Sequence, residues 1–159
     1  MTDELTRALD EYDAPAVRAL VAEGVDVNTR AWHGATPLLV VVELNDPMLA
    51  GELLYQGADV NARNIDGTSV LMRAALYGHP EVVRLLLTNG AEVNVSDQRG
   101  STALTLAAER SGSIEVVALL LEHEADVNVT REDGKAPMSL AQQAEFHEIV
   151  LLLSRHSQA

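Results

Sequence analysis

The sequence predicts an all-α solenoid of stacked helix-turn-helix units, because the chain repeats itself about every 33 residues. An acidic residue, a valine and an asparagine recur together at 26–28, 59–61, 92–94 and 126–128. A glycine recurs at the same step, as Gly34, Gly67, Gly100 and Gly134, and a leucine-rich run holds one place in each period. A helix pair of this size cannot bury its apolar stripe alone, so the copies must stack against one another.

The repeats divide one domain, residues 1–159, into five units. Residues 1–28 form an N-terminal cap, in which polar residues take apolar positions: Glu4, Arg7, Asp10, Glu11 and Arg18. The inner repeats are 29–61, 62–94 and 95–128. Residues 129–159 form a C-terminal cap, where Gln142, Gln143 and Ser154 replace alanine or leucine. Such polar outer faces are what the ends of a solenoid require.

The middle repeat shows how one unit is built. Asp66-Gly67 favours a tight turn at the tip of an extended finger. Ser69 can cap a first helix over 69–77, and Pro80 suits the first turn of a second helix over roughly 79–89. Gly90 then ends that helix in the left-handed conformation.

The third inner repeat departs from this plan in two places. It has one extra residue near Ser111, which we expect to lengthen the loop between its helices. It also has Glu124 where the other copies have Gly24, Gly57 and Gly90. We therefore expect Glu124 to take a positive φ, at a cost of about 1 kcal/mol.

The pattern resembles the ankyrin repeat over essentially the whole chain. The residues that carry the resemblance are GATPLLVVV at 34–42, QGADVNARNIDG at 56–67 and AALYGHPEVVRLLL at 74–87. The resemblance implies an ankyrin-repeat solenoid with short β-hairpin-like fingers. The family's histidine after the first-helix leucine is replaced throughout, by Leu39, Met72, Thr105 and Ser139. Since that histidine ties adjacent loops in the family, we expect a less stiff stack.

Composition and motifs argue against several kinds of chemistry. The net charge of −13 disfavours nucleic acid as a partner, and the absence of cysteine excludes a disulfide scaffold. No Walker, GxGxxG, HExxH or GxSxG motif is present, and no two histidines stand at metal-ligand spacing. We predict a protein without enzymatic activity, cofactor or metal. No apolar run spans a membrane and the first residues lack a signal segment, so we expect a cytoplasmic protein.

The resemblance places partner binding on the concave side, made of the fingers and first helices. The candidate residues there are Trp32, His33, Ile65, Asp66, Leu76, Tyr77, Arg99 and Arg110. Trp32 is the sole tryptophan, and tryptophan is enriched at interface hot spots. The alternative is that Trp32 folds over a neighbouring helix or the N-terminal cap. We expect Trp32, Ile65, Leu76 and Tyr77 to form one apolar patch.

The charge of the chain is unevenly distributed. The fingers and first helices sum to +1, the N-terminal cap to −5, and the second helices with their turns to −9. We expect most finger arginines either to pair with Asp or Glu between fingers or simply to reflect a GC-rich genome, and we assign Arg99 and Arg110 to a partner. A near-neutral groove favours a protein partner, of unknown identity, bound by a monomer. The alternative is a small-ligand or enzymatic protein with a pocket in the concave face.

Overall fold

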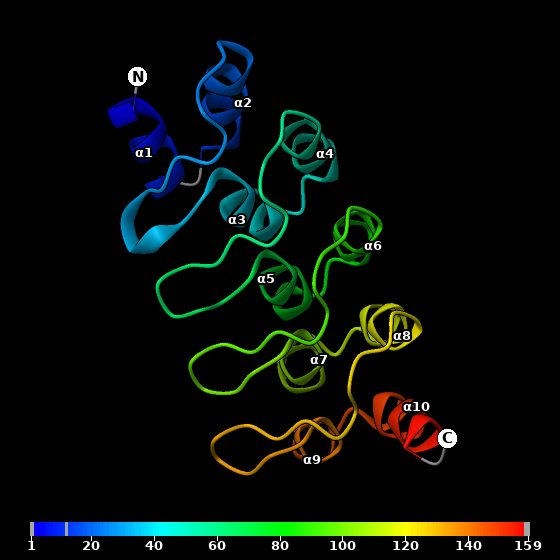
Figure 1. Ribbon diagram of the computed structural model, residues 1–159. Helices are drawn as coiled ribbons and strands as arrows, with labels where there is room; N and C mark the ends of the chain where they lie inside the picture. Colours follow the sequence, from blue (N-terminus) through cyan, green and yellow to red (C-terminus); the bar gives the residue numbers. More distant parts are fainter. Residues whose placement is uncertain (1, 12, 158–159) are drawn as a thin grey trace.

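The computed structural model describes residues 2–11 and 13–157, and in these ranges it contains ten α-helices and no strand (Figure 1). The first helices of the units form one row: α1 (Thr2–Asp10), α3 (Pro37–Val41), α5 (Val70–Tyr77), α7 (Ala103–Leu106) and α9 (Pro137–Gln143). The second helices form the other: α2 (Ala14–Ala22), α4 (Pro47–Tyr55), α6 (Pro80–Thr88), α8 (Ile114–Glu122) and α10 (His147–His156). The predicted all-α solenoid is confirmed.

Four finger loops connect one unit to the next and project beyond the first row (Figure 1). The first carries a 3-10 turn, η1 (Trp32–Gly34). Adjacent fingertips are joined by backbone hydrogen bonds: Ile65 N donates to His33 O at 3.0 Å, Gln98 N to Asp66 O at 3.1 Å, and Glu132 N to Arg99 O at 3.0 Å. This ladder sets the spacing of the fingers.

The core is aliphatic and lies between the two rows. Leu38, Leu71 and Leu104 occupy one position in three successive first helices, and all are buried. Leu53, Leu86, Leu120 and Leu153 do the same in the second helices. Buried alanines such as Ala74 and Ala75 keep α5 close to α7. Each leucine is therefore covered by the neighbouring units as well as by its own.

The first helices begin with side-chain caps. Thr36, Ser69 and Thr102 accept hydrogen bonds from Leu39 N, Met72 N and Thr105 N. Three of the residues that replace the family's histidine also accept a bond: Met72 Sδ, Thr105 Oγ1 and Ser139 Oγ, from the backbone N–H of Ser69, Thr102 and Ala136. These bonds lie within one repeat, so they close a helix end and do not tie repeats together.

The recurring asparagines tie the repeats together instead. Asn28 Nδ2 donates to Gly57 O at 3.0 Å, and Asn28 Oδ1 accepts from Asp59 N at 2.9 Å. Asn61 makes the same pair of bonds to Gly90 and Glu92, and Asn94 to Glu124 and Asp126. Each of these side chains clamps the loop of the following repeat, which holds the stack in register.

The extra residue near Ser111 does not lengthen a loop, which corrects the prediction. It is absorbed in a π-helical turn, η3 (Ala107–Ser111), that continues α7. Gly112 and Ser113 then lead into α8 just as Gly78 and His79 lead into α6. Widening the helix keeps the two-residue connection, so that α8 still stacks on its neighbours. The first helix of the first inner repeat ends differently, in the 3-10 turn η2 (Val42–Leu44).

Glu124 has a φ of 63°, so the predicted left-handed conformation is confirmed. We expect Glu124→Gly to raise the free energy of unfolding by about 1 kcal/mol, because glycine adopts this conformation without strain. Chemical denaturation would measure the change. Glu122→Gly removes the same charge from the last residue of α8 and should instead destabilise the protein. A lower stability for Glu124→Gly would contradict the strain at this position.

Candidate partner-binding surface

The fingers and first helices line two open grooves on the same side of the stack. The first groove lies between α1, the first finger and α3, and its volume is about 360 Å³. The second lies between the second and third fingers, α5 and α7, and has the same volume. Asn64 and Arg73 line both grooves, so the two grooves adjoin.

Trp32 stands at the first groove with 72% of its surface exposed. Its ring meets the His33 ring edge-on, with the ring centres 5.2 Å apart. His33 itself has a φ of 57°, a conformation that non-glycine residues rarely adopt. Most of the Trp32 surface is therefore accessible, beside Leu9 and Asp10 of the N-terminal cap, which line the same groove.

The other apolar candidates are spread more widely than expected. Leu76 lines the second groove, whereas Trp32 lines the first. Ile65 is 59% exposed at the tip of the second finger and lines neither groove. Tyr77 ends α5, where its hydroxyl donates to Glu43 Oε2 at 3.1 Å and its ring stacks on His79. These residues are therefore spread along the fingers and first helices and do not lie inside one groove.

The polar candidates divide in the same way. His33 lines the first groove, and Asp66 and Arg99 line the second. Arg110 is exposed in η3 and lines neither. In the described part of the chain, the side chains of Arg99 and Arg110 form no ion pair. Both cations are therefore available to a ligand.

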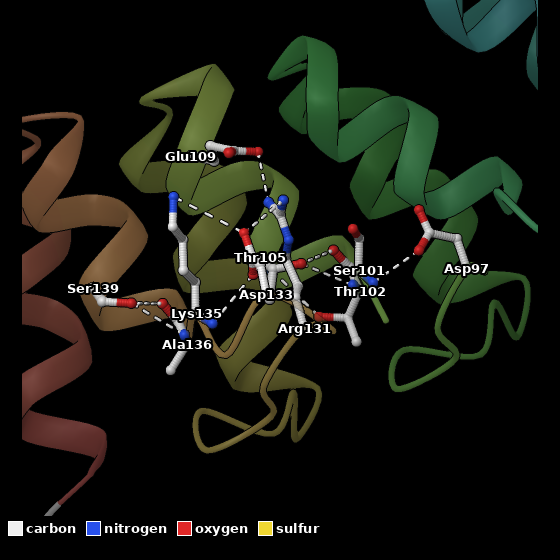
Figure 2. A network of polar contacts seen from close by, with 10 residues as sticks. All are labelled: Asp97, Ser101, Thr102, Thr105, Glu109, Arg131, Asp133, Lys135, Ala136 and Ser139. Carbon is white, nitrogen blue, oxygen red and sulfur yellow. Dashed lines mark hydrogen bonds and ion pairs between the residues drawn. The ribbon is translucent and has the colours of Figure 1, made fainter. Parts of the chain in front are cut away.

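The other finger arginines are used within the stack. Arg30 Nη1 donates to Arg63 O at 2.8 Å, and Arg63 Nη2 donates to Ser96 O. These two arginines bind backbone carbonyls of the next finger and not carboxylates, which corrects the expected pairing. Arg131 does pair with carboxylates: Figure 2 shows it between Glu109 and Asp133, at 3.0 and 3.3 Å.

Sequence reasoning missed the residues at the centre of this surface. Arg73 Nη1 lies 3.0 Å from Glu43 Oε1, in a pair whose side chains are 29% and 9% exposed. Asn64 lies beside Arg73, and Asp10 of the N-terminal cap also reaches the first groove. The signal for Arg73 was present in the sequence, because the other repeats carry Val40, Leu106 and Leu140 at its position.

The described residues contain no cluster of three or more side chains suited to a metal ion. None of the described helices is long and apolar enough to cross a membrane.

The chain matches a family model along most of its length. A family model described as ankyrin repeats (3 copies) matches residues 5–97 and 71–159, which together span nearly the whole chain. No curated protein matches the chain.

Proposed function

This chain belongs to the ankyrin-repeat family, and from that premise we propose that it is a non-enzymatic module that binds a partner protein. Ankyrin repeats are generally protein–protein interaction modules. We assign binding to the concave surface of fingers and first helices. The observation that carries this assignment is the exposed Trp32 at the mouth of the first groove, because a large exposed aromatic side chain beside a groove is typical of an interface anchor.

The hydrogen bonds between neighbouring repeats support the proposal. The fingertips are joined by backbone hydrogen bonds, and Asn28, Asn61 and Asn94 clamp successive repeats. A preformed surface limits the entropy that association costs.

The second candidate is a protein that binds a small ligand in the concave face. The groove volume of about 360 Å³ lies at the lower end of the range of ligand pockets. Because the grooves are open and adjoin one another, they suit an extended polypeptide better than an enclosed metabolite. Specific binding of a metabolite in the absence of any protein partner would favour the second candidate.

Affinity capture from the native host tests the proposal. We expect Trp32→Ala and Tyr77→Ala to lose the partner that the wild type captures, because both remove apolar area from the concave surface. Tyr55→Ala is the matched control, since Tyr55 is 94% exposed on α4 in the opposite row. Retention of every partner by both concave variants would show that binding occurs elsewhere.

Binding to the captured partner should depend only weakly on salt. Beyond the N-terminal cap, the fingers and first helices carry a net charge of +1, whereas the second helices with their turns carry −9. Long-range attraction to a near-neutral surface is small, so screening removes little of it. We expect the affinity to change less than about threefold between low and moderate ionic strength, as measured by titration calorimetry. A steep loss of affinity with rising salt concentration would instead indicate that the partner binds the acidic second helices.

The monomeric state and the cytoplasmic location stay predictions.

A further inference from the structure

Arg73 is a charged residue at an aliphatic position. Val40, Leu106 and Leu140 hold this place in the other first helices. Among the described residues, the Nε atom of Arg73 is buried and has no hydrogen-bond partner. A buried N–H group without a partner destabilises the folded state. A residue that breaks the local pattern at such a cost is expected at a functional site.

The guanidinium of Arg73 has N–H donors that its contact with Glu43 does not use. An arginine carries five N–H donors, and within the described residues the ion pair with Glu43 is the one polar contact of this side chain. The Nε atom of Arg131 is likewise buried without a partner, but the guanidinium of Arg131 also hydrogen-bonds both Glu109 and Asp133. Because Nε is buried, it is the Nη atoms of Arg73 that can bind a further acceptor from the groove, such as a carboxylate.

Asn64 adds a second donor beside Arg73. Its Oδ1 accepts hydrogen bonds from Asp66 N at 3.1 Å and Thr68 N at 2.8 Å, which fixes the orientation of the amide. Its Nδ2 has no partner in the part of the chain that the structure describes. Asn64 and Arg73 both line the two grooves, so both side chains lie where the grooves adjoin.

The side chains around the place where the two grooves adjoin, called the junction below, limit what can bind there. Trp32 lines the first groove on one side of it, and Leu76 lines the second on the other. Asp10 and Glu43 line the first groove, Asp66 and Asp97 line the second, and Glu43 is already paired with Arg73. These acidic side chains repel a ligand with several negative charges. The junction therefore suits a single carboxylate with apolar groups beside it.

We propose that Arg73 and Asn64 anchor the carboxylate of one Asp or Glu side chain in an extended partner segment, whose neighbouring large apolar side chain packs against Trp32. This inference rests on the proposed function and specifies its partner. An extended chain is the occupant that fits two open grooves meeting at one anchor, since it can enter the first groove and leave through the second.

A peptide library displayed on phage and selected on the full-length protein tests the anchor. We expect the selected peptides to share one acidic residue next to a large apolar residue. Their affinity should fall at least about tenfold for Arg73→Leu/Glu43→Leu. The double variant removes the whole ion pair. It places at the Arg73 position the leucine that the third inner repeat has as Leu106, and at the Glu43 position the leucine that the middle repeat has as Leu76. Arg84→Leu, which removes an arginine from α6 in the opposite row, should leave the affinity unchanged.

Changing the acidic residue of the peptide to its amide separates the anchor from indirect effects. It should weaken binding to the wild type by the same factor and have no further effect on the double variant, because the two partners act together. The proposal would be overturned if the selected peptides shared no acidic residue. It would also be overturned if the amide substitution weakened binding to the wild type and to the double variant equally. N-acetylglutamate that binds as tightly as the peptides would overturn the extended segment as the occupant.

The failure of this inference differs from the failure of the proposed function. Peptides that lose affinity with Trp32→Ala but not with the double variant would overturn the anchor and leave the concave surface as the binding site. Peptides that are indifferent to both variants would overturn both.

Discussion

Leu86→Ala is expected to lower the free energy of unfolding by about 3 kcal/mol. Leu86 is fully buried in α6, which packs against α4, α5 and α8. Removing its side chain leaves a cavity between three neighbouring helices, so that the middle repeat loses contact with the units on both sides. Because the stability of a stack is the sum of its units and their interfaces, the loss should appear in the unfolding of the whole chain.

Urea denaturation followed by circular dichroism measures this change. Leu151→Ala is the control, because Leu151 is exposed on α10 and its truncation should change the stability little. A loss of less than about 1 kcal/mol for Leu86→Ala would contradict the packing between repeats.

Arg73→Leu alone is expected to destabilise the protein by about 2 kcal/mol, whereas Arg73→Leu/Glu43→Leu is expected to be at least as stable as the wild type. The single change leaves the Glu43 carboxylate, whose side chain is 9% exposed, with the Tyr77 hydroxyl but without its cation. An unpaired carboxylate in this setting is costly. Loss of one partner of a fully buried pair costs about 3–5 kcal/mol, and the partial exposure of Arg73 reduces this.

The double change removes both charges. Leucine stands at the Arg73 position in two other repeats and at the Glu43 position in one, where the remaining repeats carry Glu109 and Gln143. Thermal denaturation of the two variants beside the wild type would measure both effects. A single variant as stable as the wild type would show that the carboxylate of Glu43 is well solvated without Arg73. A double variant more stable than the wild type would show that the chain keeps this ion pair at a cost in stability.

Much of the fold was predictable because it depends on local backbone requirements. Gly90 and Glu124 occupy the same place after a second helix, and both take a positive φ as expected. The π-helical turn η3 was not predictable in this way. Whether one extra residue enters a loop or a helix depends on how the next helix must stack, and that is a property of two units together.

The candidate surface was predictable to a similar extent. Trp32 was expected on a turn beside Gly34, and a large side chain on a fingertip has no helix to cover it. Arg73 was missed because the summed charge of its helix does not reveal it; it stands out only beside Val40, Leu106 and Leu140 at the same position of the other repeats. Asp10 was missed for a different reason: its approach to the groove depends on the packing of α1 beside α3, which no repeat spacing encodes.

Hydrogen exchange of the protein with its captured partner tests the binding surface most directly. We expect slower exchange, on addition of the partner, at the fingertips around Trp32, Ile65 and Arg99 and at the exposed end of α5. The amides of α4, α6 and α8 should exchange as they do in the free protein. Slower exchange confined to these second helices, with the fingertips unchanged, would place the partner on the second helices. That result would contradict the concave surface as the binding site.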